Sequence, residues 1–479
     1  MVFSSLIFIF KFLPVFLLAY YLSPVRYRNW IAMLASCAFY AWGAPRFLFV
    51  LLATSTLDYH LSAQLHSGQP ERHRKRVLAL AVAINLVALL YFKYANFFVE
   101  QTDSLLAHFG FGSLAWTRVA LPIGISFFTF QKISYLVDVY RGTAQRARSL
   151  HDYVLYVILF PQLIAGPIVR YHDVAMQLIR RDHTSERFFA GIWRFSIGLG
   201  KKVLIANSLA AVADRGFGMK VSELTPGFAW LGVVCYAFQI YFDFSGYSDM
   251  AIGLGRMMGF EFLENFNCPY VARNFTEFWR RWHISLSNFM REYVYIPLGG
   301  NRVGAFRGYF NLWIVFVLSG FWHGAAWNFV VWGAYHGFFL TLDKMTRNTR
   351  WARMPLGLAI PINFLLVLFS WVLFRAESLG SAVFYFQRMF ALPSLAAAQP
   401  MMAWSEFITP HAWMVLAIAA AIVFAPAFTS EVRAPRQRIT TATRPWPLTA
   451  QFVAACLLLF LSAAALATGG FNPFIYFRF

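Results

Sequence analysis

The residues best placed to do chemistry are histidines that lie among apolar residues. Most of the eleven histidines fall in loops or at segment ends, but His323 lies near the middle of a stretch, 308–342, without a charged residue. Ionisable groups at membrane depth are costly and usually face a protein interior or a wet cavity. Desolvation favours the neutral imidazole, which can act as a general base toward a hydroxyl or thiol. The same burial also fits a histidine that only packs in the core and bonds a carbonyl, so both interpretations stand at this point.

The neighbours of His323 support a crowded setting. Trp322 and Gly324 flank it, and Gly320 lies three residues earlier. The two glycines remove side-chain bulk, so a substrate or another backbone can approach closely. His336 follows thirteen residues later, which places it on a different face of any continuous helix. We therefore expect His336 to be structural.

A second histidine, His283, lies in a segment of mixed character, 273–302. Aromatic and aliphatic residues recur there at helical spacing and charged residues interleave with them, so the segment is too polar to span a bilayer. It fits an amphipathic helix at the interface or in a cytoplasmic recess, with Thr276 as the cap and 297–300 as the end. The adjacent Arg280 and Arg281 suit a phosphate-bearing ligand. They equally suit lipid headgroups or a salt bridge to Glu277.

Two further segments depart from plain apolar helices. In 241–250, Asp243 lies in an apolar run, where it could orient a histidine, relay protons or satisfy backbone donors. Ser245 and Gly246 are expected to loosen the helix at this point. In 160–167, two prolines and a glycine interrupt an apolar run, which predicts a kinked or re-entrant segment, or a span that ends early.

The composition indicates the elements that position these residues. Hydrophobic residues make up 59% and charged residues 13% of the 479-residue chain, against roughly 45–50% and about 25% in soluble proteins. We expect an all-α polytopic membrane protein with roughly 11 to 13 membrane segments, some broken or re-entrant, plus amphipathic interfacial helices. The apolar stretches are 1–22, 29–45, 47–65, 77–96, 119–138, 151–169, 188–213, 226–258, 308–342, 354–374, 407–430 and 445–477.

The net charge of +20 is concentrated in short loops, which argues against nucleic acid as the partner. The loops 72–76, 141–148, 347–353 and 433–438 are basic, and the positive-inside rule places them on the cytoplasmic side. The segments 97–117 and 391–410 are expected outside. Anionic-ligand binding is the alternative explanation of the charge. The four cysteines show no metal-ligand or redox spacing, and no zinc motif, Walker loop or serine elbow is evident.

These segments together resemble the membrane-bound O-acyltransferase (MBOAT) family, in its bacterial branch typified by the membrane component of alginate O-acetylation. The most specific signals are Phe-Trp-Arg-Arg-Trp-His at 278–283 and Trp-His-Gly at 322–324, forty residues apart. The other matching segments are 1–5, 91–97, 121–127, 163–167, 241–249, 284–287 and 472–477.

The resemblance implies one membrane domain over 1–479, with N-terminal helices at 1–118, a catalytic core at about 119–345 and C-terminal helices at 354–479. It implies a ring of helices around a central tunnel, with His323 at the catalytic position and His283 at a second characteristic polar position. For acetyl-CoA, the acetyl donor, we expect contacts from Arg280, Arg281, Trp282 and Asn288. Asp243, Ser245, Tyr247, Trp322 and Gly324 are expected to line or support the tunnel.

In this branch an acetyl group crosses the bacterial inner membrane to a periplasmic partner, which acetylates an exported polysaccharide. Alginate is the leading expectation, and peptidoglycan, cellulose and teichoic-acid modification are the alternatives. A transporter or a scaffold without catalysis is the competing class. Transporters often show internal inverted repeats, and none is evident, because the two histidine motifs have no counterparts in the first half.

Overall fold

The computed structural model describes the chain except residues 165, 221–222, 350–352, 392–401, 429–446, 470–473 and 476–479. The described residues are predominantly helical and contain no strand, which confirms the predicted all-α class. They form two compact units. Unit 1 comprises 1–192 and 251–262, and unit 2 comprises 193–250 and 263–479. The basic loop at 433–438 lies entirely outside the described residues, as do parts of the loop at 347–353 and of the segment 391–410.

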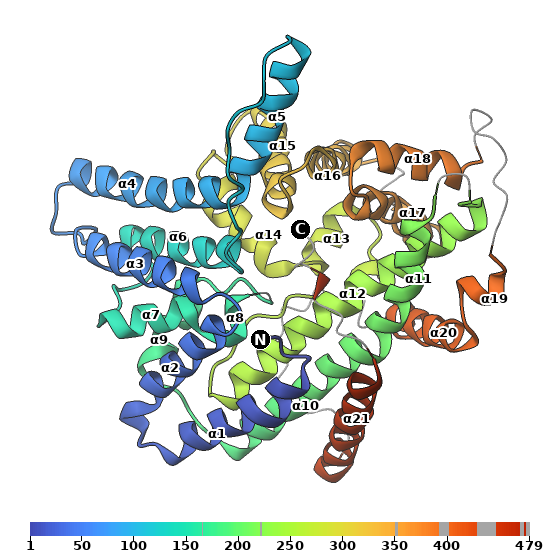
Figure 1. The fold of residues 1–479 in the computed structure, drawn as a ribbon. Coiled ribbons are helices and arrows are strands. Elements are labelled where there is room, and N and C mark those ends of the chain that lie inside the picture. Colours follow the sequence, from blue (N-terminus) through green and yellow to red (C-terminus); the bar gives the residue numbers. More distant parts are fainter. Residues whose placement is uncertain are drawn as a thin grey trace. The chain divides into compact units, whose positions relative to one another are not determined.

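Unit 1 is built from the N-terminal helices, of which α2, α3, α4, α6 and α7 pack against one another (Figure 1). Its helices are α1 (Leu13–Leu22), α2 (Arg28–Ala41), α3 (Pro45–Ser62), α4 (Glu71–Leu89), α5 (Ala95–His108), α6 (Ile125–Arg141), α7 (Leu150–Ile158), α8 (Phe160–Leu163) and α9 (Tyr171–Ile179). A buried ion pair joins α3 to α6, where Asp58 lies 3.2 Å from Lys132. On the same α6, Asp138 lies 2.9 Å from Nδ1 of His172.

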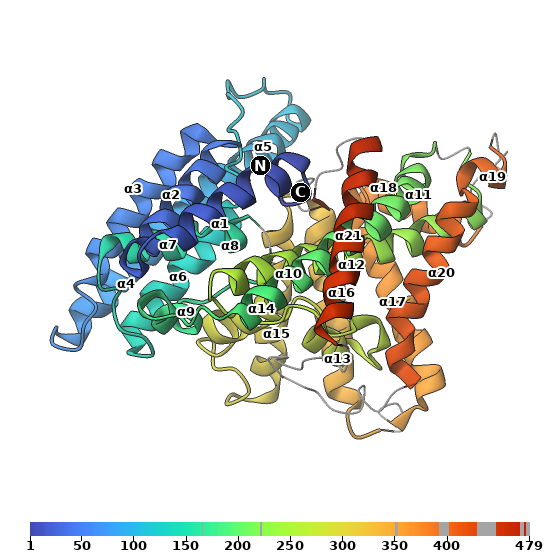
Figure 2. The ribbon, with the colours of Figure 1, turned by 90° about the horizontal axis from the view of Figure 1, so that it is seen from below.

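Unit 2 holds the rest of the chain, and α10 (Ser185–Gly200) and α12 (Pro226–Met257) have residues in both units. Figure 2 shows α17, α20 and α21 of this unit as steeply inclined helices. The remaining helices are α11 (Asn207–Gly218), α13 (Phe275–Arg281), α14 (Ile284–Met290), α15 (Ala305–His323), α16 (Trp327–Thr346), α17 (Leu356–Arg375), α18 (Leu379–Met389), α19 (Trp404–Phe407), α20 (Pro410–Phe424) and α21 (Leu448–Thr468).

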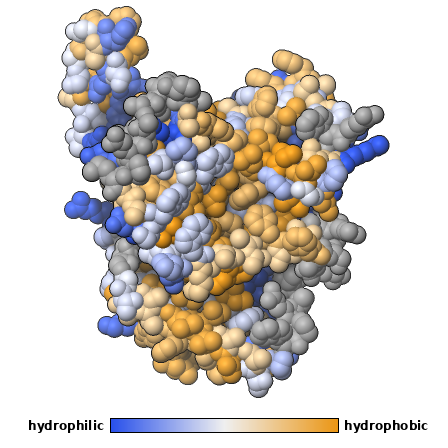
Figure 3. All heavy atoms as spheres, turned by 90° about the vertical axis from the view of Figure 1, so that its right-hand side faces the viewer, coloured by the Kyte–Doolittle hydropathy of each residue, from blue (hydrophilic) through white to orange (hydrophobic). Residues whose placement is uncertain are grey.

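The surface is apolar where a bilayer would contact it. Figure 3, which views the right-hand side of Figure 1, shows a largely hydrophobic face. Only 11% of the most apolar window of α21 is buried inside the protein, and Phe460 on this helix is 70% exposed. A soluble chain would not leave such a helix uncovered. The chain is therefore a multi-pass membrane protein.

Six helices in the described part of the chain are long and apolar enough to cross a membrane. They are 71–108, 185–218, 226–257, 356–375, 410–428 and 448–468. Each of the other apolar stretches is also helical, but its helices are shorter or carry polar residues such as Asp58 and Lys132. The predicted break at 160–167 is confirmed: α7 ends at Ile158, and α8 is a single turn that begins with Phe160-Pro161.

Candidate active site

His323 is the last residue of α15, where the long charge-free stretch breaks. The chain leaves the helix at Gly324 and re-enters one at Trp327, so α15 and α16 form a closely packed hairpin. A Cβ on Gly324 would lie 2.2 Å from the ring of Phe329, and one on Gly320 would lie 2.2 Å from the Phe329 carbonyl oxygen. Gly320 thus lets another backbone approach closely, which is one of the two roles expected of it, whereas Gly324 makes room for the ring of Phe329.

The hydrogen bond of the His323 ring fixes its tautomer. Nδ1 lies 2.6 Å from the carbonyl oxygen of Ser319 on the same helix. A carbonyl oxygen only accepts, so Nδ1 carries a proton, and in the neutral ring Nε2 therefore carries the lone pair. The side chain is 5% exposed and lies against the rings of Trp322, Trp332 and Phe374. This is the arrangement that a buried general base needs.

His283 lies at a break in the segment 273–302 and not inside a helix. The expectation of one amphipathic helix was wrong, because α13 ends at Arg281 and α14 begins at Ile284, with His283 at φ +43° between them. The preceding loop satisfies the backbone here: Asn267 N–H donates to the Arg281 carbonyl, and Ile284 N–H donates to the Asn265 carbonyl. Asn274, and not Thr276, caps α13 through its side chain. The break at His283 thus arises from a loop that is distant in sequence, whereas the cap of α13 is local.

Asn265 also orients the His283 ring. Its Oδ1 accepts from the backbone N–H of Ser285 at 3.2 Å, which identifies this atom as the oxygen, and it lies 3.1 Å from Nδ1 of His283. Nδ1 therefore donates and Nε2 carries the lone pair, as in His323. Burial lowers the pKa of His283 well below its ordinary value, and a charge on His323 would lower it further. The ring of Trp322 lies 6.5 Å from that of His283 and 4.9 Å from that of His323.

His336 is closer to His323 than its spacing indicated. Helical periodicity separates the two histidines only within one continuous helix, and the break at Gly324 makes α15 and α16 two neighbouring helices instead. Trp332 contacts both rings, at 5.0 Å from His323 and 4.6 Å from His336. Nδ1 of His336 accepts a hydrogen bond from Nε1 of Trp279 at 3.1 Å, so His336 holds its proton on Nε2. It has the opposite tautomer to the other two histidines.

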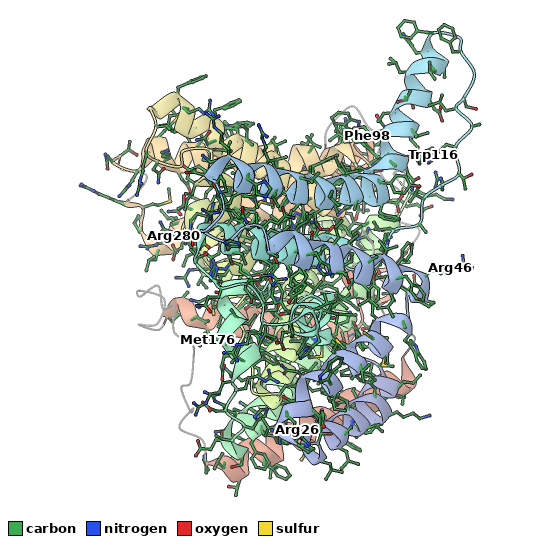
Figure 4. All side chains as sticks on the ribbon, turned by 90° about the vertical axis from the view of Figure 1, so that its left-hand side faces the viewer. Arg26, Arg46, Phe98, Trp116, Met176 and Arg280 are labelled. Atoms are coloured by element: carbon green, nitrogen blue, oxygen red, sulfur yellow. The ribbon has the colours of Figure 1, made fainter. Side chains whose placement is uncertain are left out.

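The residues expected to contact the donor differ in their surroundings. Arg280 is exposed, as Figure 4 also shows, whereas Arg281 is buried and its Nη2 lies 2.8 Å from Oε1 of Glu277. The alternative of a salt bridge to Glu277 is thus present in the structure for Arg281. Trp282 is buried against other aromatic rings, and Asn288 is half-buried on α14. Their roles toward a donor stay predictions.

Asp243 lies on α12 beside two partners. It forms an ion pair with Lys202, and its Oδ2 accepts from the backbone N–H of Ile475 at 2.7 Å. The expectation that Ser245 and Gly246 loosen this helix was wrong, because α12 runs unbroken from Pro226 to Met257. Gly246 instead admits a neighbouring helix, since a Cβ there would lie 2.7 Å from the Gly198 carbonyl oxygen.

The remaining supporting residues pack around the same helix. The ring of Tyr247 lies tilted against that of Phe474 with the centroids 4.6 Å apart, and Phe244 lies 4.6 Å edge-on to His283. Ser245 is buried. Unit 2 thus brings His323, His283, Trp322 and Gly324 together, and Phe244 connects His283 to the region around Asp243. The central tunnel stays a prediction.

Three supporting residues were missed by sequence reasoning. Lys202 is a charge inside an apolar stretch, a signal that could have found it. Asn265 and Trp332 carry no such signal, because their importance depends on which distant residues they contact.

Comparisons with known proteins bear on this arrangement. A model of the family described as MBOAT, membrane-bound O-acyltransferase, matches residues 144–383. The chain is 43% identical to a probable alginate O-acetylase of Azotobacter vinelandii over the full length of both proteins. A protein of the same description from Pseudomonas aeruginosa is 47% identical over 82% of this chain and 75% of its own. A peptidoglycan O-acetyltransferase of Helicobacter pylori is 37% identical over 85% of this chain and 83% of its own.

The family model covers the segment that holds Asp243, His283, His323 and His336. Full-length similarity at this level, together with a helical membrane fold and two buried histidines in the matched segment, leads to one conclusion. The chain belongs to the membrane-bound O-acyltransferase family and is an O-acyltransferase.

Proposed function

We propose that this chain transfers acetyl groups from acetyl-CoA, a cytoplasmic donor, across the inner membrane to a periplasmic partner that O-acetylates an exported polysaccharide. The observation that carries the proposal is the tautomer of His323, whose Nδ1 bonds the Ser319 carbonyl at 2.6 Å and leaves Nε2 as the proton acceptor. A thioester is already activated, so positioning an acceptor hydroxyl and removing its proton supply the remaining catalysis.

The proposed reaction needs no group beyond the two substrates. The acceptor oxygen bonds to the acetyl carbonyl carbon as its proton moves to Nε2 of His323. The carbon–sulfur bond then breaks, and the same proton passes from His323 to the departing CoA thiolate. His283 lies beyond Trp322 with its Nε2 also in the accepting state, which suits it to orient one of the reacting groups.

Alginate is the polysaccharide that the relatives favour. The relatives described as probable alginate O-acetylases match over most or all of this chain. The peptidoglycan O-acetyltransferase, at 37% identity, supports peptidoglycan as the second candidate. Cellulose and teichoic-acid modification remain as alternatives that share the chemistry.

Sided membrane vesicles test the direction of transfer and the polymer together. Inside-out vesicles that contain the chain and its native partners would receive radiolabelled acetyl-CoA outside and alginate, peptidoglycan fragments or cellulose inside. We expect base-labile label on the enclosed alginate and none when donor and polymer are exchanged between the two sides. Label that depends on donor inside the vesicles would contradict the proposed direction, and label on another polymer would replace alginate.

Arg280 offers a sharper test of the donor site than Arg281 does. Arg281→Ala would leave Glu277 without its 2.8 Å partner, so a loss of activity could reflect misfolding. Arg280 is exposed and Arg302, near the end of the same segment, is exposed as well, which makes Arg302→Ala a matched control. We expect Arg280→Ala to raise the KM for acetyl-CoA about 5- to 10-fold, as the loss of one charged phosphate contact would. Equal KM values in the two variants would refute the role of Arg280.

A further inference from the structure

Unit 1 contains a second cluster of polar residues, which the proposed acyl transfer does not use. It consists of Tyr20 and Tyr21 at the end of α1, Arg28 at the start of α2, and Arg181 and His183 after α9. We refer to these five residues as the arginine–tyrosine cluster.

The tyrosine hydroxyls hold the cluster in place. Tyr20 donates to the Met258 carbonyl oxygen at 2.9 Å, and Tyr21 donates to the Met257 carbonyl oxygen at 2.5 Å. The Tyr20 hydroxyl also accepts from Nη2 of Arg181 at 3.1 Å. The tyrosines are thereby fixed to the same short stretch of backbone.

Both guanidinium groups contact Tyr20. Arg181 reaches its hydroxyl, and the Arg28 guanidinium carbon lies 5.5 Å from the centroid of its ring and 5.2 Å from that of Tyr21. Cation–π contact of this kind orients an arginine without neutralising its charge. Two positive charges are therefore held against one tyrosine, one at its hydroxyl and one over its ring.

No carboxylate among the described residues forms an ion pair with Arg28 or Arg181. The hydrogen bonds of Arg181 go to neutral oxygens of Gln177, Tyr20 and Asn29. The Nε atoms of both arginines are buried and have no acceptor in the described part of the chain. Burial, followed by the charges of Arg28 and Arg181, lowers the pKa of His183 to about 4. The cluster thus holds two guanidinium groups whose charge no carboxylate of the described residues neutralises, and their Nε–H groups have no acceptor there.

The surroundings of the cluster are those of a membrane boundary. Large apolar side chains are exposed beside it: Leu22 is 76%, Val25 71% and Met176 73% exposed. Figure 4 labels Met176 and also Arg26, which lies two residues before Arg28 in the sequence. Tyrosine and arginine next to lipid-exposed aliphatic residues are typical of the interface, where phosphate headgroups lie. Guanidinium is also the protein cation best matched to phosphate oxygens.

We propose that Arg28 and Arg181, oriented by Tyr20 and Tyr21, form a binding site for a phosphate group at the membrane boundary of unit 1. The phosphate belongs either to the headgroup of an anionic phospholipid or to a soluble phosphate ester. The exposed Leu22, Val25 and Met176 would accommodate acyl chains and so favour the lipid source.

The test compares three probes on the full-length protein in a neutral detergent. Short-chain phosphatidylglycerol carries the phosphate and acyl chains, glycerol 3-phosphate carries the phosphate alone, and short-chain phosphatidylcholine is the zwitterionic comparison. Binding is measured by native mass spectrometry and by the concentration dependence of the thermal midpoint. The variant is Arg28→Gln with Arg181→Gln. The matched control is Arg26→Gln with Arg180→Gln, which changes the net charge equally at exposed positions of the same two loops.

We expect the variant to weaken phosphatidylglycerol binding about 30-fold, because each arginine near the surface contributes about a fivefold factor, and the control to change it less than threefold. Arg28→Gln alone, which breaks no hydrogen bond of the described chain, should weaken binding about fivefold. An equal effect in variant and control, or no effect in either, would overturn the site. Glycerol 3-phosphate that binds as tightly as phosphatidylglycerol, with the same dependence on Arg28, would retain the phosphate site and exclude the lipid source.

Discussion

Gly320 is the position where a single added carbon tests how tightly the fold holds His323. It lies three residues before His323 on α15 and faces the backbone of α16. A Cβ at Gly320 would lie 2.2 Å from the Phe329 carbonyl oxygen and 3.1 Å from the Cα of Gly333. Real Cβ contacts are essentially never shorter than 3.0 Å, so Gly320→Ala requires α15 and α16 to separate by about 0.8 Å.

The structure predicts that activity falls much more than stability. Overpacking costs about 1–3 kcal/mol, and alanine returns up to about 1 kcal/mol through its helix propensity. The net loss of about 0–2 kcal/mol corresponds to a fall of a few degrees in Tm. Misplacement of a catalytic group by about 1 Å can cost about 100-fold in rate, and His323 lies on the helix that moves.

The assay compares Gly320→Ala with Gly337→Ala. Gly337 lies on α16, where a Cβ would make only ordinary contacts at 3.6 Å and beyond. We expect the control to retain its kcat for acetyl transfer and its thermal midpoint, whereas Gly320→Ala should lose about 100-fold in kcat. A Gly320→Ala protein with wild-type kcat would show that the close contact of α15 and α16 does not position His323.

Three further predictions concern individual contacts. Lys202→Met leaves the buried Asp243 without its cation and should lower the free energy of unfolding by about 3–5 kcal/mol, measured by thermal unfolding in detergent. Adding Asp243→Asn should restore most of the lost stability, and a double variant without recovery would contradict the pairing. Trp279→Phe removes the donor to Nδ1 of His336 and should cost about 1–3 kcal/mol; a Tm equal to that of the wild type would show that the bond contributes nothing. The hydrogen bond to the Asp138 carboxylate raises the pKa of His172. The pair of His172 and Asp138 therefore stabilises the fold fully below about pH 6.5, and this stabilisation is lost as the pH rises through the raised pKa. The Tm difference between wild type and His172→Gln should shrink over that rise, and a constant difference would contradict the pair.

The helices were predictable because membrane burial leaves a strong local signal. Apolar stretches of about 20 residues marked the positions of α10, α12, α17, α20 and α21. Proline and glycine at 160–167 marked a break, because they change the backbone locally. The length of an apolar stretch and the position of a backbone break both depend on residues that are adjacent in the sequence, so one sequence is enough to predict them.

The corrections arise where a distant partner overrides the local pattern. The segment 273–302 has helical periodicity, but the loop that contains Asn265 takes over its backbone hydrogen bonds beside His283. Gly246 weakens a helix in isolation, yet it permits close packing against Gly198 in this fold. The neighbourhood of His336 could not be predicted either, because it depends on where the 308–342 stretch breaks.

The candidate site was predicted through its residue types more than through its geometry. His323 was identified by its burial and His283 by its motif, whereas the tautomers of both depend on Ser319 and Asn265. Arg280 and Arg281 are adjacent in sequence, but one is exposed and the other is buried in an ion pair. Adjacent residues on a helix point in different directions, so their shared charge did not imply a shared role.

The most direct test of the account is the kcat of purified, membrane-reconstituted His323→Asn at saturating acetyl-CoA. The asparagine amide takes the position of Nδ1 and can keep the hydrogen bond to the Ser319 carbonyl, but it cannot accept the acceptor's proton. General base catalysis contributes about 10²–10⁴-fold, so the account predicts a kcat lower by that factor, with the KM for the donor and the Tm close to those of the wild type. A kcat within a few-fold of the wild type would contradict the assignment of His323 as the base.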